Sequence, residues 1–549
     1  MSNFFNTINI GLKSLQAQKK SMDTTSHNIS NANTEGYSKQ RAIHSTTDPY
    51  TVPGMGMPQG AGQVGTGVEI SEIDRVKNQF IEGQIWDKKQ GQGYWEKRYQ
   101  GLHRAELVVN EPSENSLSAV MDNFWNSLND LSNNPEDTAI RATVKERATT
   151  LADTFHSLDD QLADYKKSLN RDVNTTVKEI NSLARRVADL NSQIVHIKGT
   201  GKNPNDLMDK RDNLVEKLNK KVNVQTNQDK RGNLNVSLGG ISLVANDQIN
   251  ALTTESSDNN EDKILFEELD SKANIDNGEL AAIKELRDEV IPGYREDLDN
   301  IAQKFATKFN DVHQAGYDLN GDSGENFFVS DSDTNQDGNI DDKDITADSI
   351  LVNEIIKDDI NKIAAGSLSD NQKVVTAKSD SSYTGEEYKI TIDKDNSEYT
   401  LKNLETGTII KNNESFTGDS IDLSSSIGLT FNVKDSGSAI INKGSGSGGN
   451  ALDLANVIKK DKIFDEATVM DKYQSMVSSL GVEGQRANQM VSNQETLVNQ
   501  LENQRQSISG VSLDEEMSQM IKYQQAYNAA AKLISNSDRM LDSLMSIIR

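Results

Sequence analysis

The sequence is poor in the residues on which enzymes and metal sites depend. It contains no cysteine among 549 residues, which excludes disulfides, thiolate metal sites and cysteine nucleophiles. No two of its six histidines lie three or four residues apart, so the helical zinc motif H-E-x-x-H is absent. Phosphate-binding, dinucleotide-binding and nucleophile-elbow motifs are also absent. The sequence therefore predicts a protein that is not an enzyme and requires no cofactor.

Long apolar runs and an excess of positive charge are missing as well. No stretch approaches the ~18 apolar residues of a membrane helix, and no basic region followed by an apolar core opens the chain. Acidic residues outnumber basic ones by 84 to 58, a net charge of −26, so we expect no nucleic-acid binding and no membrane insertion. Because only 34% of residues are hydrophobic, the apolar side chains must be concentrated in stripes.

Both ends of the chain carry apolar residues at helical spacing. Each end predicts an amphipathic helix with one narrow apolar seam, the kind that coiled-coil partners bury. An ordinary helix packed on its own domain is the alternative, but termini usually fray, which favours a partner helix or a second copy. We expect an assembly interface made of Phe5, Ile8, Leu12, Leu15, Met22, Ile29, Leu513, Met517, Met520, Tyr527, Ile534, Leu541, Met545 and Ile548.

A third seam runs through the middle of the chain, over residues 151–197. At about 1.5 Å per residue this helix would be roughly 70 Å long. It is expected to end near the glycines of 199–201, before Pro204, and a shorter helix is expected over 206–220. The seam includes Leu183 and Leu190, which continue its seven-residue spacing.

Beyond this helix the period of the pattern changes. Alternating residues over 222–275 predict short strands, and a helical pattern returns over 279–314, with a break or kink expected at Pro292. The polar stretch 370–445 predicts an inserted β domain, with its best strands at 388–392 and 429–433. A Gly/Ser linker follows, and helix is expected from residue 451 to the end.

These elements predict an α+β multidomain fold. A long helical coiled-coil or bundle core is formed by both chain termini, and β-rich outer domains are inserted. The expected parts are a terminal coiled-coil domain (1–50 with 505–549), a helical rod domain (51–221 with 276–330 and 450–504), a small β domain (222–275), an acidic calcium-loop-like segment with a helix (331–369), and an inserted β domain with its linker (370–449).

One acidic loop has the spacing of a twelve-residue calcium site. Gly338 stands at the sixth position, where the loop turns sharply, and the last position is Asp rather than the usual bidentate Glu, which resembles the dockerin type of loop. A solvated acidic surface loop is the alternative. The candidate ligands of a structural calcium ion are Asp333, Asn335, Asp337, Asn339, Asp341 and Asp344.

The segment 28–40, NISNANTEGYSKQ, resembles the N-terminal signature of flagellar rod, hook and hook-associated proteins. Its Asn and Ser side chains suit a capped helix end followed by tight turns, and Gly36 allows a backbone conformation that other residues resist. Segments that resemble the hook-associated members of this group are 209–214 (DKRDNL), 309–321 (FNDVHQAGYDLNG), 512–517 (SLDEEM) and 523–527 (YQQAY).

The resemblance implies a secreted subunit of the flagellum that forms the hook–filament junction at the distal end of the hook, after unfolded export by the flagellar type III apparatus. Its implied partners are other copies in a ring or tube, the hook protein, a second hook–filament junction protein, and an export chaperone at the C-terminal helix. Two alternatives stay open. A hook or distal-rod subunit would lack the 309–321 element and the long middle seam. A secreted calcium-binding adhesin or interaction protein would not explain the terminal seams.

Overall fold

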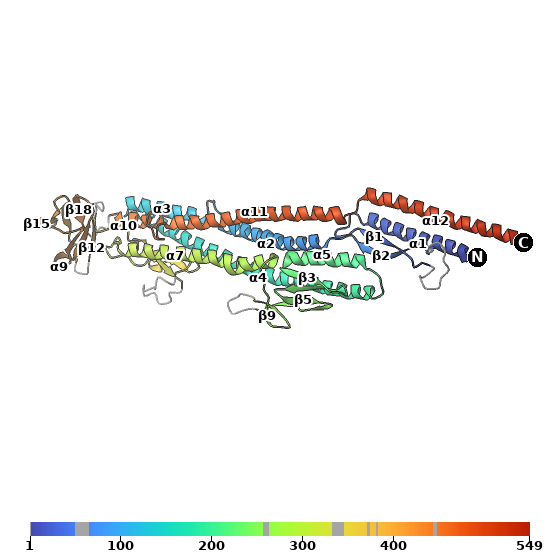
Figure 1. Ribbon diagram of the computed structural model, residues 1–549. Helices are drawn as coiled ribbons and strands as arrows, with labels where there is room; N and C mark the ends of the chain where they lie inside the picture. Colours follow the sequence, from blue (N-terminus) through green and yellow to red (C-terminus); the bar gives the residue numbers. More distant parts are fainter. Residues whose placement is uncertain are drawn as a thin grey trace. The chain divides into compact units, whose positions relative to one another are not determined.

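The computed structural model describes residues 2–49, 65–255, 263–331, 345–369, 374–379, 383–442 and 447–548 (Figure 1). The chain forms two compact units, and each combines segments that are far apart in the sequence. Unit 1 comprises Met1–Gln100, Asn170–Glu285 and Arg486–Arg549, and unit 2 comprises Gly101–Leu169 and Leu286–Gln485. Three helices contribute residues to both units, namely α2 (Gln79–Val109), α4 (Thr138–Lys198) and α11 (Val469–Ser509).

In unit 1 the two ends of the chain meet. Helix α1 (Ser2–Ser30) packs along helix α12 (Leu513–Ile548), as Figure 1 shows. The antiparallel hairpin of β1 (Gln40–Thr46) and β2 (Val68–Arg75) packs against α1, and its register is irregular between Ile43 and His44. Long terminal helices combined with inserted strands confirm the predicted α+β fold class.

The middle of unit 1 is a helix followed by two small antiparallel sheets. Helix α4 ends at Lys198, and the prediction of its end and of the shorter helix after Pro204 is confirmed. The elements after it are α5 (Asn205–Lys221), a sheet of β3 (Val224–Gln228), β4 (Leu234–Leu238), β5 (Ile241–Ala245) and β6 (Gln248–Ile249), a sheet of β7 (Leu252–Glu255), β8 (Lys263–Phe266) and β9 (Ser271–Lys272), and α6 (Glu279–Glu285).

The buried face of α4 departs from the predicted seam in its C-terminal half. Leu183 and Leu190 are only half-buried, whereas Ala184, Ala188 and Asn191 are buried. An α-helix with 3.6 residues per turn drifts by about 20° with each seven-residue step, so a strict heptad leaves the buried face after a few repeats. The seam prediction was wrong for these two leucines, which remain half-exposed.

The helices of unit 2 are shaped by local hydrogen bonds. Helix α3 (Leu117–Asn133) is capped by Ser116, whose hydroxyl accepts a hydrogen bond from the amide of Ala119. Helix α7 (Ile291–Gln314) follows a π-helical turn, η1 (Leu286–Val290), so the hydrogen-bond pattern changes immediately before Pro292. The stretch stays helical from Glu279 to Gln314, so the helix is not broken there, and a kink stays a prediction. Proline has no N–H to donate to the carbonyl four residues earlier, which favours a changed hydrogen-bond pattern there.

The inserted β domain of unit 2 has one hydrophobic core between two antiparallel sheets. Tyr388, Ile390 and Ile392 of β13 point into it and alternate with exposed residues, and Phe431 of β17 is fully buried there. The first sheet is β12 (Val375–Ser379), β17 (Leu429–Val433) and β16 (Ser420–Leu423), and the second is β15 (Ile409–Ser415), β14 (Glu398–Asn403), β13 (Tyr388–Asp393) and β18 (Gly437–Ile441). The remaining elements of the unit are β10 (Phe328–Ser330), β11 (Ile350–Val352), α8 (Glu354–Asp358), η3 (Ile360–Lys362), α9 (Ser424–Ile427) and α10 (Gly449–Lys459).

The C-terminal region is not one helix, as the sequence had led us to expect. Helix α10 ends at Lys459, and α11 starts at Val469 after Thr468, whose hydroxyl bonds with Asp471 at the helix N-terminus. A second break at 510–512 separates α11 from α12. There the amide of Gly510 bonds the carbonyl of Gln506, and a Cβ at Gly510 would lie 2.3 Å from that oxygen. The helix-capping hydroxyl of Thr468 and the backbone geometry at Gly510 therefore end the helices although the apolar pattern continues.

None of the described helices has the length and apolar composition that crossing a bilayer requires. The five-part division of the chain expected from the sequence stays a prediction.

Candidate assembly interface

The inner face of α12 is a regular heptad seam. Its buried and half-buried positions are spaced alternately by four and three residues, the pattern of a helix that pairs with another helix. They are Glu516, Met520, Tyr523, Tyr527, Ala530, Ile534, Ser537 and Leu541, and Ala526 beside Tyr527 is half-buried as well. The two helices approach closely at Gly11, where an added Cβ would lie 2.6 Å from Cγ1 of Ile534. Of the predicted interface, Met520, Tyr527, Ile534 and Leu541 are thus brought together on this face.

Leu513 and Met517 of the predicted C-terminal seam lie on another face of α12. They are 49% and 57% exposed, and Ile521, which was not predicted, is 53% exposed on the same face. Met545 continues the heptad seam four residues after Leu541 but is 62% exposed. The side chain of Ile548 lies outside the described residues. Helix α12 therefore carries apolar side chains on two faces, and this chain covers only one of them.

Helix α1 buries small and polar residues instead of its predicted apolar seam. Its buried positions are Gly11, Ala17, Ser21, Thr24, Thr25 and Asn28. The reason is the hairpin beside it, because the hydroxyl of Ser21 bonds Nε2 of His44 at 3.0 Å, and the ring of His44 stacks on Tyr523 of α12. The predicted residues Ile8, Leu15, Met22 and Ile29 are only partly covered, and Leu12 is 47% exposed. The side chain of Phe5 lies outside the described residues.

Asn28, the first residue of the signature segment, joins the two ends of the chain. Its Oδ1 accepts hydrogen bonds from the hydroxyl of Tyr37 at 2.7 Å and from the amide of Gln40 at 2.9 Å. Its Nδ2 donates to the carbonyl of Gln40 and to Oε2 of Glu516, both at 2.9 Å. Asn28 and Glu516 are 1% and 3% exposed, so the contact is shielded from water. We call Asn28, Tyr37, Lys39, Gln40 and Glu516 the terminal latch.

The charge of Glu516 is balanced within the latch. Nζ of Lys39 lies 3.2 Å from Glu516 and 3.1 Å from the more exposed Glu515. Although burial opposes it, the hydrogen bonds to these two carboxylates raise the pKa of Lys39. Burial and the nearby carboxylates also raise the pKa of Tyr37, so its hydroxyl remains a donor. Glu516 belongs to a recognised segment, but its contact with Asn28 could not be predicted, because no local pattern pairs residues 488 positions apart.

The signature segment is also tied to α5, through the DKRDNL element. The amide and hydroxyl of Ser38 donate to the carboxylate of Asp209 at 3.0 and 2.9 Å. Arg75 of β2 bridges Asp209 and Asp212, at 2.7 and 2.9 Å, and Lys77 lies 2.7 Å from Asp212. Although burial disfavours its charged form, Lys77 and Arg75 hold the pKa of Asp212 below its usual value. These charges fix the point where the terminal helices leave the rest of unit 1.

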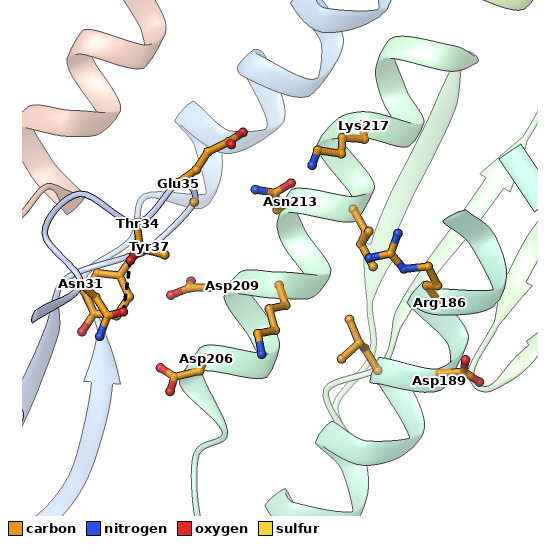
Figure 2. Close-up of a pocket in the computed structure, with 14 residues that line it drawn as sticks. Asn31, Thr34, Glu35, Tyr37, Arg186, Asp189, Asp206, Asp209, Asn213 and Lys217 are labelled. Carbon is orange, nitrogen blue, oxygen red and sulfur yellow. Dashed lines mark hydrogen bonds between the residues drawn. The ribbon is translucent and has the colours of Figure 1, made fainter. Parts of the chain in front are cut away.

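A groove of about 590 Å³ lies between the signature segment, α4 and α5 (Figure 2). Gly36 forms part of its wall with a φ of +75°, and a Cβ there would lie 2.8 Å from Nδ2 of Asn213. A glycine is required at this position because both the backbone conformation and the close approach exclude a side chain. We call this hollow the α4–α5 groove.

The other recognised element, 309–321, organises the core of unit 2. Oδ1 of Asn310 accepts from the amides of Phe327 and Phe328, and Nδ2 donates to the carbonyl of Phe328. His313 is fully buried, with Nδ1 2.6 Å from the carbonyl of Glu325 and Nε2 accepting from the amide of Ala364. Burial lowers the pKa of His313 to about 4. The side chains of Asn310 and His313 therefore hold the loops of unit 2 together.

The candidate calcium ligands at 333–344 lie outside the described residues. Within the described part of the chain, no three His, Asp or Glu side chains are grouped so that they could hold a metal ion.

Three parts of the chain match models of flagellar families. Residues 8–37 match the family "Flagella basal body rod protein", and residues 502–547 match "Flagellar basal body rod FlgEFG protein C-terminal". Residues 102–328 match "Flagellar hook-associated protein FlgK helical domain". The two terminal matches cover most of α1 and α12 together with the latch residues Asn28, Tyr37 and Glu516.

Curated relatives extend the similarity over the full length. Flagellar hook-associated protein 1 of Bacillus subtilis is 28% identical, with 100% of this chain and 99% of the relative covered, and that of Escherichia coli is 28% identical, with 98% and 99% covered. The solved flagellar hook junction protein FlgK of Burkholderia pseudomallei shares the fold, with a TM-score of 0.61 and 19% identity over 78% of this chain and all of that one.

Paired terminal helices joined by the signature segment, together with these matches, define a structural protein of the flagellar rod and hook group and not an enzyme. The helical body and the full-length relatives narrow the assignment. Over its full length the chain is similar to flagellar hook-associated protein 1, and this similarity implies a place in the flagellum. The resemblance inferred from the sequence segments is confirmed.

Proposed function

We propose that this chain assembles with other copies at the distal end of the hook and forms the junction between hook and filament. Its similarity to hook-associated protein 1 over the full length supports this function. The structural observation that carries the proposal is that each terminal helix has an apolar face which the chain itself covers only partly on α1 and leaves exposed on α12.

The geometry of these faces favours a tubular assembly. At about 100° per residue, the apolar seam of α1 lies roughly 120° around the helix from its buried positions. The exposed residues Leu513, Met517 and Ile521 lie roughly 110° from the heptad seam of α12. A helix with two faces separated in this way contacts a neighbour on each face, as in a closed ring or tube, whereas an isolated pair needs only one face.

The similarity to hook-associated protein 1 extends the proposal to specific partners and to the route of assembly. The hook protein lies on one side of the junction and the second hook–filament junction protein on the other. The chain leaves the cell unfolded through the flagellar type III apparatus, with an export chaperone covering the C-terminal seam. In the secreted monomer the terminal helices are disordered, and they fold when neighbours bury their apolar faces, which prevents premature assembly.

Charge placed in the heptad seam tests this function. We expect the double substitution Met520→Asp with Ile534→Asp to abolish filament attachment in a strain that lacks the native copy, because buried carboxylates would disrupt the helix pair. The matched control is Gln525→Asp with Asn536→Asp, at exposed positions on the opposite side of α12. Motility and the number of filamented cells are measured alongside the amount of secreted protein. Normal filaments from the seam variant would contradict the proposal.

A structural calcium ion at residues 333–344 is a separate part of the proposal, supported by the spacing of the oxygen ligands. Bound calcium should raise the melting temperature of the purified chain relative to chelator-treated protein, because an ion that binds only the folded state stabilises it. Asp337→Asn with Asp341→Asn should remove the difference. Identical melting curves with calcium and with chelator would exclude the site.

A further inference from the structure

The α4–α5 groove carries positive charge that the chain does not use. Elsewhere in unit 1 the cations of the latch and of the α5 contacts are paired, such as Lys39, Arg75 and Lys77. Arg186, Lys210 and Lys217 line the groove, are exposed, and form no ion pair or side-chain hydrogen bond with any other described residue. Three uncommitted cations around one hollow are unexpected in a chain of net charge −26.

The acidic residues of the groove do not neutralise these cations. Asp209 is held by Ser38 and Arg75, and Asp206 accepts a hydrogen bond from Gln40. Asp189 extends away from α5 in Figure 2. Glu35 is the remaining carboxylate on the signature side of the groove.

The floor of the groove is partly apolar. Leu190 lines it and is half-exposed, beside the buried Leu214. A second hollow of about 350 Å³ adjoins it, shares Lys217, and is lined by the half-exposed Leu183. These are the two leucines of the α4 seam that the fold leaves uncovered. An apolar floor edged by cations is the arrangement that receives an amphipathic helix with acidic flanks.

We propose that the α4–α5 groove binds the first turns of α12 from a second copy of the chain. Leu513, Met517 and Ile521 form an exposed apolar row there, and the exposed Asp514 lies beside it. The row supplies apolar side chains for Leu183 and Leu190, and Asp514 supplies a carboxylate for the free cations. The inference rests on the proposed self-assembly and names the surface that covers part of the exposed face of α12.

The test uses the full chain, expressed in a strain that lacks the native copy. A photo-crosslinking residue at Asn213, on the wall of the groove, should give a dimer of the chain in assembled flagella. The triple substitution Arg186→Glu, Lys210→Glu and Lys217→Glu should reduce this dimer at least about tenfold, because like charges would then face each other. The matched control is Lys178→Glu, Arg185→Glu and Lys202→Glu, which changes the charge equally at exposed positions outside the groove.

A charge swap makes the test specific. Adding Asp514→Lys to the groove variant should restore the dimer, and circular dichroism of each purified variant should match the wild type. An equal loss in the control triple, a crosslink to a different protein, or no rescue by the swap would overturn the docking. Normal filaments without a dimer at position 213 would overturn the docking alone, whereas a wild-type chain that restores no filaments would overturn the proposed function.

Discussion

Removal of the Asn28 side chain should loosen the connection between the two ends of the chain. Asn28→Ala removes Oδ1 and Nδ2 of Asn28. The backbone amide and the backbone carbonyl of Gln40 then lose their hydrogen bonds to these two atoms. A buried backbone group left unpaired costs about 1–3 kcal/mol, so two groups, partly compensated by water, cost roughly 3 kcal/mol. Glu516 retains Lys39, and Tyr37 is half-buried and can reach water, so we assign them no further cost.

Hydrogen exchange measures this loss locally, which is necessary because a chain with two compact units does not unfold in one step. In assembled flagella, where the terminal helices are folded, the amide of Gln40 should exchange roughly a hundredfold faster in Asn28→Ala than in the wild type, as expected for a loss of about 3 kcal/mol. Asn33→Ala, at an exposed position of the same segment, is the matched control and should change exchange very little. If the Gln40 amide exchanged at the same rate in both variants, the latch would contribute nothing and the reasoning would be refuted.

Two further predictions concern a buried histidine and a glycine. Burial lowers the pKa of His313 to about 4, so between pH 4 and about 6.5 the unfolded chain binds more protons than the folded chain. The contribution of His313 to the free energy of unfolding should therefore be full above pH 6.5 and fall by about 3 kcal/mol as the pH approaches 4. Exchange of unit 2 amides against pH measures this, and His313→Gln should abolish that part of the pH dependence. Gly36→Ala should destabilise unit 1 by more than the roughly 1–2 kcal/mol that a left-handed backbone costs an alanine, because the new Cβ would also meet Asn213. Gly240 has a φ of +86° and open space around it, so Gly240→Ala should cost only the roughly 1–2 kcal/mol of the backbone conformation. Equal melting of the two glycine variants would show that the approach of Asn213 has no energetic weight.

The elements of this fold were predictable where their signals are local. The end of α4 before Pro204, the strand β13 and the irregularity at Pro292 each follow from residues within a few positions of one another. The breaks at 460–468 and 510–512 were missed because the apolar pattern continues across them, while the groups that stop the helix, such as Gly510, act through backbone geometry.

The inner face of α1 could not be predicted from the sequence. Ser21, Thr24 and Asn28 read as the polar side of an amphipathic helix, and they are buried because the hairpin supplies hydrogen-bond partners such as His44 and Gln40. A polar residue is usually expected on the exposed face of a helix, but it can be buried when another part of the chain supplies its hydrogen-bond partner. The apolar residues of α1 were correctly located as a stripe, but the stripe lies on the side that this chain leaves partly open.

Two contacts set the register of the terminal helix pair and agree with each other. Asn28 meets Glu516, and Gly11 meets Ile534. At about 1.5 Å per residue, both intervals span roughly 26 Å, so the helices stay in step along this length. A carboxylate in an apolar seam reduces stability in general, but it specifies one alignment. A slide of one heptad would take Glu516 away from Asn28 and Lys39, and an unpaired buried carboxylate costs about 3–5 kcal/mol. Glu516, a charged residue within the seam, is therefore the feature that aligns the two ends of the chain.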